Sequence, residues 1–271
     1  MHILDIIQLG FLHKALLAGS CVAVACALLG VFLVLKRMSL IGDGLAHVAF
    51  GAVALGLFLN MIPIVVAVPV VVLASLGILL LAEKAVVYGD AAIGMVSAVG
   101  IAIGVVLASS AGGFNADLFG LLFGNILAIS TVEAWEAVIL SGLVIIMILL
   151  FYHDLFMVSF DEQYGRVAGI NTTAINRVLA MLTAFTVVLG IRVVGTMLVS
   201  ALMIFPAVTA LQLGRSFRRT LVLAALIAVL SVLGGIALSF AGNYPTGATI
   251  VLVNAAFLVF AFFLRKYARS E

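Results

Sequence analysis

An aspartate and a histidine, Asp43 and His47, stand four residues apart in the segment SLIGDGLAHVAFG. Between Met38 and Ala82 they are the only formally charged residue and the only histidine. Side chains at positions i and i+4 share a helix face, so a carboxylate oxygen and an imidazole nitrogen would point the same way. Such donors bind first-row divalent cations. The pair predicts a transient metal site that other helices or a second copy of the chain must complete.

The same spacing is compatible with a purely structural role. Asp43 would then cap a helix that begins after Ser39 and Gly42, and His47 would be a core histidine bonded to a carbonyl. Small residues surround the pair and would let neighbouring helices approach closely. These residues are Gly42, Gly44, Ala46, Ala49 and Gly51.

The elements that hold these residues must lie in lipid. Of the 271 residues 66% are hydrophobic and 9% are charged, whereas soluble domains carry about 25% charged residues. This composition excludes a soluble enzyme, a nucleic-acid-binding domain and a disordered chain. A helix needs about 20 apolar residues to cross a bilayer. Runs of suitable length lie at 15–35, 43–60, 62–82, 92–111, 132–151, 174–191, 193–211, 220–241 and 247–264. We therefore predict an all-α polytopic membrane protein, with residues 1–271 as a single transmembrane domain.

A further stretch, 117–130, is too short to cross alone, and its polar residues Asp117 and Asn125 are weaker candidates for lining a pathway. They would equally serve to cap and pack a short helix. With nine crossings and a cytoplasmic C-terminus, 11 of the 13 basic residues lie inside, and a tenth crossing at 117–130 lowers this number to 9. The positive-inside rule therefore favours nine spans over ten.

Three local patterns predict further structure. Ser130 and Thr131 precede Glu133 and Glu136, which is typical of a helix start. The spacing of Gly100 and Gly104 favours close helix packing. Both topologies place 152–173, the longest hydrophilic stretch, in the cytoplasm, where its composition alone indicates a solvated loop.

The chain contains no GxxxxGK[ST] phosphate loop, no HExxH and no GxSxG motif. These motifs would indicate nucleotide binding, a metalloprotease and a serine hydrolase. The sequence thus indicates a protein that is not an enzyme. If it carries out ATP-driven transport, the ATPase must be another polypeptide.

Four separated segments resemble, in order, motifs of the membrane permease subunits of metal-type ABC importers, which carry zinc, manganese or iron. The resemblance covers about residues 11–265. The segments are LVLKRMSLIGDGLAHVAFGAVALG, DLFGLLFGNILAIS, FDEQYGRVAGI and RVVGTMLVSALMIFPAVTALQL.

The resemblance implies a homodimer around a central pathway in the bacterial plasma membrane. Two cytoplasmic ATPase subunits would drive it and an extracytoplasmic metal-binding protein would supply the ion, which is cargo and not a permanently bound cofactor. The part of 152–173 between residues 160 and 170 would be a coupling helix seated in the ATPase. Its aromatic residues would fill a pocket, its charged residues would pair at the rim and its glycines would turn the chain. The residues in question are Phe160, Asp161, Glu162, Tyr164, Gly165, Arg166 and Gly169.

One alternative function is a gradient-driven secondary transporter, in which Asp43 and Asp117 would bind protons or sodium. It would need no ATPase partner, so ATP depletion separates the two functions. One aspartate–histidine pair suits Mn²⁺ and Zn²⁺ alike, and the sequence does not choose between zinc, manganese and iron.

Overall fold

The computed structural model describes residues 10–84, 88–110 and 129–268. Within these ranges the regular structure is entirely helical. In chain order the helices are α2 (Gly10–Leu35), α3 (Ile41–Phe58), α4 (Pro63–Lys84), α5 (Gly89–Ser110), α7 (Thr131–Leu150), α8 (Tyr152–Phe160), α9 (Glu162–Val167), α10 (Thr172–Val194), α11 (Thr196–Leu213), α12 (Phe217–Gly242) and α13 (Thr246–Ala268).

Nine helices in the described part of the chain are long and apolar enough to cross a membrane. They coincide with the nine predicted apolar runs to within a few residues, so the predicted fold class is confirmed. The two short helices, α8 and α9, lie in the polar segment 152–173. Residues 111–128 lie outside the described ranges, and a tenth crossing at 117–130 stays untested.

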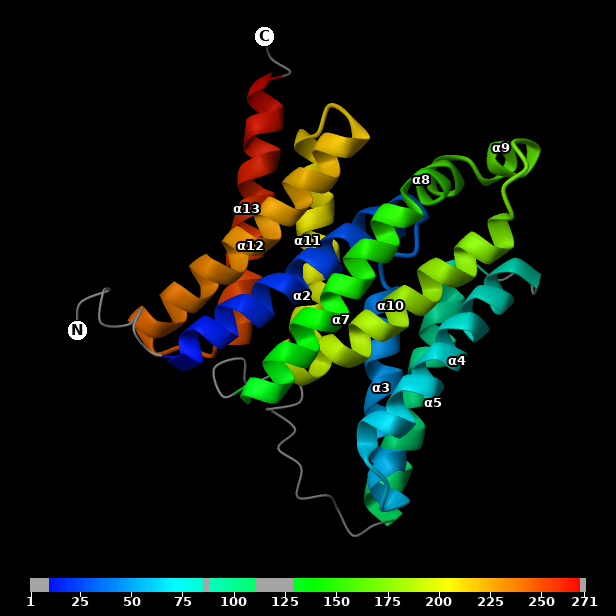
Figure 1. The fold of residues 1–271 in the computed structure, drawn as a ribbon, viewed down its shortest axis with the longest axis vertical. Helices are drawn as coiled ribbons and strands as arrows, with labels where there is room; N and C mark the ends of the chain where they lie inside the picture. Colours follow the sequence, from blue (N-terminus) through cyan, green and yellow to red (C-terminus); the bar gives the residue numbers. More distant parts are fainter. Residues whose placement is uncertain (1–9, 85–87, 111–128, 269–271) are drawn as a thin grey trace.

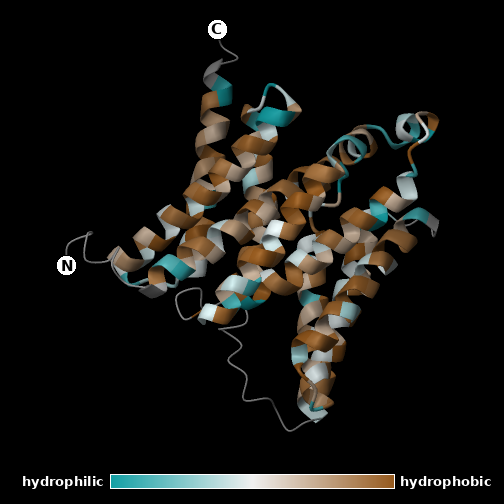
Figure 2. Cartoon of the chain, in the orientation of Figure 1, coloured by the Kyte–Doolittle hydropathy of each residue, from teal (hydrophilic) through white to brown (hydrophobic). Residues whose placement is uncertain are grey.

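Helix α2 lies at the centre of the bundle, where it packs against α7, α10, α11 and α12. Helices α3, α4 and α5 form a second group, which reaches the bottom of the view in Figure 1 and joins the rest through α10 and α11. Helix α13 packs against α11 and α12. Figure 2 shows hydrophobic residues along the long helices and hydrophilic residues gathered near their ends. This is the pattern expected of helices that use lipid as solvent.

Glycines allow the closest helix crossings, as predicted for Gly100 and Gly104. A Cβ atom on Gly100 would lie 2.7 Å from the Cα of Val48, and one on Gly104 would lie 2.7 Å from the ring of Phe50. Gly51 on the facing surface of α3 is packed as closely against α5, because a Cβ atom added to it would lie 2.3 Å from the Gly100 carbonyl oxygen. Helix α5 therefore holds α3, which carries Asp43 and His47, at backbone contact.

The predicted start of α7 is confirmed. Ser130 and Glu133 form a reciprocal capping box, in which the Ser130 side chain accepts from the Glu133 amide and the Glu133 carboxylate accepts from the Ser130 amide. Arg192 near the end of α10 lies 3.9 Å from a Glu133 oxygen and 3.7 Å from a Glu136 oxygen. These ion pairs tie α7 to α10 at the side of the membrane predicted to be external.

Candidate metal pathway and coupling segment

Asp43 lies in the first turn of α3 and His47 lies one turn further along. Nε2 of His47 is 3.6 Å from Oδ2 of Asp43, so the two side chains do share a helix face. Within the single chain, the His47 side chain is 34% exposed and the Asp43 side chain 46% exposed. His47 is therefore not a buried core histidine, and both groups are accessible to an ion.

A third polar group approaches Asp43 from α11. The hydroxyl of Ser200 lies 3.3 Å from Oδ1 of Asp43 and at the same distance from the carbonyl oxygen of Thr196. The N-cap of α3 is Leu40, with no side-chain hydrogen bond, so Asp43 does not take the capping role. We did not single out Ser200 from the sequence, although its position in the motif RVVGTMLVSALMIFPAVTALQL was a usable signal.

Small residues position the pair, as their composition predicted. A Cβ atom on Gly42 would lie 2.7 Å from the sulfur of Met203 on α11. One on Gly44 would lie 2.6 Å from Cγ2 of Ile93 on α5. Neighbouring helices thus cover the sides of α3 next to the pair, and this contact fixes the face that stays open.

A single chain offers an incomplete site in the part that the structure describes. No group of three or more histidine, cysteine, aspartate or glutamate side chains there could hold a metal ion. The weaker predicted candidates, Asp117 and Asn125, lie outside the described residues. Asp43, His47 and the Ser200 hydroxyl are the donors that the described structure brings together.

The predicted coupling residues lie at the end of α8, on α9 and in the turns on either side of α9. Asp161 caps α9, because its Oδ1 accepts from the amide of Tyr164 at 3.0 Å. The carboxylate of Glu162 pairs with the Arg166 guanidinium one turn later, at 2.7 Å. The Phe160 and Tyr164 side chains remain 60% and 63% exposed. The end of α8 and the start of α9 therefore present aromatic side chains at the surface of the single chain.

The two glycines of this segment have different roles. Gly169 has a φ of 86°, a left-handed conformation that favours glycine, and it turns the chain between α9 and α10 as predicted. The same prediction for Gly165 is wrong, because this residue lies inside α9 and is buried. A Cβ atom there would lie 3.4 Å from Cγ2 of Thr172, an ordinary van der Waals distance, at the place where α9 packs against the start of α10.

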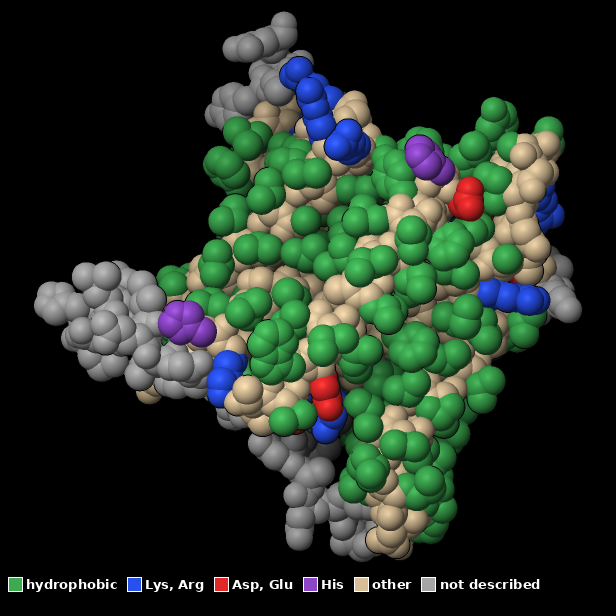
Figure 3. Space-filling view, in the orientation of Figure 1, with side chains coloured by type: hydrophobic (Ala, Val, Ile, Leu, Met, Phe, Trp, Pro, Cys, Tyr) green, Lys and Arg blue, Asp and Glu red, His purple; other side chains and the backbone are tan. Residues whose placement is uncertain are grey.

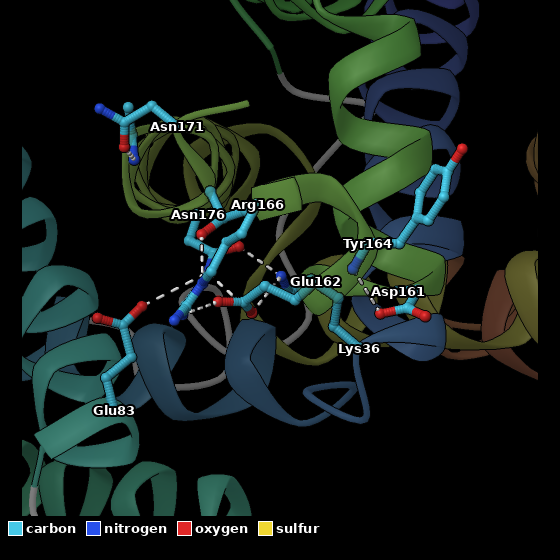
Figure 4. A network of polar contacts seen from close by, with 10 residues as sticks. Lys36, Glu83, Asp161, Glu162, Tyr164, Arg166, Asn171 and Asn176 are labelled. Atoms are coloured by element: carbon cyan, nitrogen blue, oxygen red, sulfur yellow. Dashed lines mark hydrogen bonds and ion pairs between the residues drawn. The ribbon is translucent and has the colours of Figure 1, made fainter. Parts of the chain in front are cut away.

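A polar junction joins α9 to three long helices (Figure 4). Nζ of Lys36, just after α2, lies 3.8 Å from Oε2 of Glu162 and donates to the side-chain oxygen of Asn176 on α10. The Asn176 amide nitrogen lies 3.3 Å from Glu162 and 3.4 Å from Glu83 at the end of α4. This junction was not among the predicted sites, although a polar Asn176 within an apolar run was a signal for it.

Burial and charge act in opposite directions at this junction. Burial lowers the pKa of Lys36, whose side chain is 11% exposed, although the nearby Glu162 and Glu83 carboxylates oppose this shift. Burial would raise the pKa of Glu162. Hydrogen bonds from Arg166 and Asn176 and the charge of Lys36 outweigh that effect, so this pKa lies below its usual value. The Glu162 carboxylate is therefore held in its ionised form.

The chain matches known transport proteins over nearly its whole length. The ABC 3 transport family matches residues 8–265. The manganese transport system membrane protein MntC of Listeria innocua is 32% identical over 257 residues, which cover 95% of this chain and 91% of the relative. A probable iron transport system membrane protein of Haemophilus influenzae is 35% identical over 260 residues, covering 96% and 95%.

A solved structure has the same fold. The match is to a chain of PsaBC from Streptococcus pneumoniae, determined in complex with a Fab, with a TM-score of 0.87 and 28% sequence identity. It covers 98% of this chain and 97% of the other. The helical arrangement in Figure 1 is therefore shared with an experimentally determined protein.

Proposed function

The chain belongs to the ABC 3 transport family, the membrane permeases of metal-type ABC importers, and we propose that it carries manganese, zinc or iron across the bacterial plasma membrane. It is a multi-pass protein of that membrane. We favour manganese because one relative is named for manganese transport and oxygen donors predominate around Asp43. The observation that carries the proposal is the pairing of Asp43 with His47 on the open face of α3.

The donor set suits an ion that must be bound and then released. Asp43 offers a carboxylate, His47 an imidazole nitrogen and Ser200 a hydroxyl oxygen, and Mn²⁺ and Zn²⁺ accept such oxygen and nitrogen donors. With Ser200 next to Oδ1, the other carboxylate oxygen of Asp43 faces His47. An incomplete set from one chain leaves coordination positions for water or a second copy, which favours transient binding.

A second copy of the chain would cover this face. Asp43 and His47 lie on a membrane-spanning helix and remain partly exposed in the single chain. Ionisable groups within membrane-spanning helices are rare, and they normally face protein or water rather than lipid. Two chains placed with their α3 faces together would enclose a polar pathway that carries two aspartate–histidine pairs.

Coupling to a separate ATPase would occur through α9. Tyr164 and Val167 are 63% and 88% exposed on this short helix, which gives an ATPase an apolar surface to grip. The junction around Glu162 connects α9 to α2, α4 and α10. Movement of α9 would therefore shift the end of α2, from which a tight turn with Arg37 at a φ of 57° leads into α3. An extracytoplasmic metal-binding protein would deliver the ion to the other side.

Uptake of radioactive manganese into vesicles that contain the complete transporter tests the pathway. We expect His47→Ala to lower uptake by about tenfold or more, because loss of a metal-site group costs affinity of this order. The control variant His13→Ala removes an exposed histidine near the start of α2 and should retain uptake. Unchanged uptake in His47→Ala, with normal expression, would remove this residue from the pathway.

The same vesicles distinguish an ATP-driven importer from a gradient-driven carrier. Withdrawal of ATP with the ion gradients preserved should abolish uptake, and collapse of the gradients with ATP present should leave it intact. Uptake that follows the gradients would instead favour the secondary transporter. Competition by excess zinc or iron then ranks the three metals.

Coupling is tested by the variant Tyr164→Ser and its control Tyr244→Ser. Both tyrosines are 63% exposed, but Tyr244 follows α12 at the opposite side of the membrane. We expect Tyr164→Ser to reduce co-purification of the ATPase and transport-linked ATP hydrolysis, and Tyr244→Ser to leave both unchanged. Equal behaviour of the two variants would contradict the docking role of α9.

A further inference from the structure

A groove with a volume of about 740 Å³ lies between α2, α7 and α12, extending onto the start of α8. Its lining is apolar except for Tyr152 and His153 at the start of α8 and Arg218 at the start of α12. Figure 3 shows the face of the molecule that includes these helices, covered largely by hydrophobic side chains. Helix α12 lines the groove along one face, with side chains that recur every three or four residues. These are Arg218, Leu221, Val222, Ala225, Leu226 and Val229.

The groove has the length of one membrane leaflet. From Arg218 to Val229 the axis of α12 rises by about 16 Å at 1.5 Å per residue, and half of a typical hydrocarbon core is about 15 Å. In the predicted orientation helix α12 begins at the cytoplasmic side, next to the basic residues Arg215 and Arg219. The groove therefore extends from the cytoplasmic boundary of the membrane to its middle.

The charged end of the groove suits a phosphate group. The Arg218 side chain is exposed, and among the described residues it forms no hydrogen bond or ion pair. His153 lines the same end. An arginine guanidinium binds phosphate oxygens with two parallel hydrogen bonds, and basic pockets at the cytoplasmic ends of membrane helices bind anionic lipid headgroups.

We propose that this groove binds an anionic phospholipid of the inner leaflet. Its phosphate lies against Arg218 and an acyl chain follows the apolar stripe of α12. The walls of the groove suit the chain, since Leu149, Val222 and Leu226 are 64%, 54% and 53% exposed and offer apolar surface along its length.

A lipid fits this groove better than a second copy of the permease does. The proposed pathway lies on α3, which packs against α4, α5, α10 and α11. The groove is built from α2, α7 and α12, and these helices contribute none of the main contacts of α3. Two copies joined through α3 would therefore leave the groove open to the membrane.

Native mass spectrometry of the full-length protein with phosphatidylglycerol or phosphatidylcholine of the same acyl chains tests the proposal. We expect retention of phosphatidylglycerol to exceed that of phosphatidylcholine. Arg218→Gln should lower phosphatidylglycerol retention roughly fivefold, the contribution of one basic residue near a charged leaflet. The control Arg219→Gln removes a neighbouring exposed arginine outside the groove and should retain the lipid.

A second pair of variants tests the apolar part. Ala225→Phe fills the groove and should reduce phosphatidylglycerol retention, whereas Ala237→Phe, at an exposed position further along α12, should not. Equal retention by Arg218→Gln and Arg219→Gln, or equal retention of the two lipids, would overturn the proposal. Disulfide-linked dimers through Leu226→Cys would also overturn it, because a second copy would then occupy the groove.

Discussion

The carboxylate of Asp43 lies between two partners that come from different parts of the chain. Ser200 on α11 lies next to one oxygen at 3.3 Å, and His47 lies 3.6 Å from the other. A hydrogen bond to a carboxylate restricts its rotation, and a restricted ligand binds an ion with less loss of conformational freedom. In the proposed pathway Ser200 therefore positions the carboxylate of Asp43, in addition to offering its own hydroxyl oxygen to the ion.

We predict that Ser200→Ala raises the manganese concentration for half-maximal uptake by roughly tenfold or more, in line with the loss of one hydrogen bond to a charged group. The protein should otherwise remain folded. The matched control is Ser75→Ala, which removes a fully buried serine that bonds only within its own helix, to the carbonyl of Val72. Half-maximal concentrations that are equal for the two variants would exclude a positioning role for Ser200.

At the scale of elements, the contact between α3 and α5 fixes the open face of α3. The contact depends on glycines at both surfaces, because the Cβ of any other residue at position 51 or 100 would meet backbone atoms of the facing helix. Because Gly51 and Gly100 carry no side chains, the backbones of α3 and α5 come into contact, and α5 covers one side of α3. Asp43 and His47 are left at the side that α5 does not cover.

We predict that Gly100→Leu destabilises the protein by about 1–3 kcal/mol, the usual effect of overpacking a tight contact. The control Gly94→Leu lies on the same helix, where an added Cβ has no heavy atom within 4 Å. Thermal unfolding of the purified protein in detergent measures both variants. Similar melting temperatures for the two would show that the α3–α5 contact adapts to a larger residue.

The junction at Glu162 predicts a dependence of stability on pH. Because the pKa of Glu162 is lower in the folded protein than in the unfolded chain, the folded protein binds fewer protons between these two values. The ionised Glu162 carboxylate therefore contributes to the free energy of unfolding above the usual glutamate pKa of about 4.3. This contribution is lost as the pH falls through the lower folded value.

We expect Glu162→Gln to lower the melting temperature at neutral pH, and the difference from the parent protein to shrink below about pH 4. Glu136→Gln, at the opposite side of the membrane, controls for the loss of a glutamate. The measurement is thermal unfolding in detergent over this pH range. A difference that stays constant with pH would mean that the ionised carboxylate does not stabilise the junction.

At the scale of the whole molecule, the proposed pathway requires two chains whose α3 faces meet. Leu40 lies three residues before Asp43 and is 48% exposed. In a background with Cys21 and Cys26 changed to alanine, we predict that Leu40→Cys forms disulfide-linked dimers in native membranes. The control Leu226→Cys, 53% exposed on the groove face, should stay monomeric. If neither variant formed disulfide-linked dimers, the result would contradict a dimer interface at α3.

Much of this protein follows from short-range patterns in its sequence. Apolar runs of membrane-spanning length predict the nine long helices, and the serine and glutamate at 130 and 133 predict where α7 starts. The common face of Asp43 and His47 follows from helical periodicity. The family resemblance read from four motifs is confirmed by the match over residues 8–265. These features depend on residues that are close in the chain, where hydrophobicity and helix geometry act directly.

Other features required the helices to be packed together. Ser200 reaches Asp43 across 157 positions, and Lys36, Asn176, Glu162 and Glu83 meet from four separate segments. The burial of Gly165 and the groove on α2, α7 and α12 likewise depend on how helices cross. Crossing angles and distances arise from the interlocking of whole side-chain surfaces, and a linear pattern of residue types does not specify which surfaces meet.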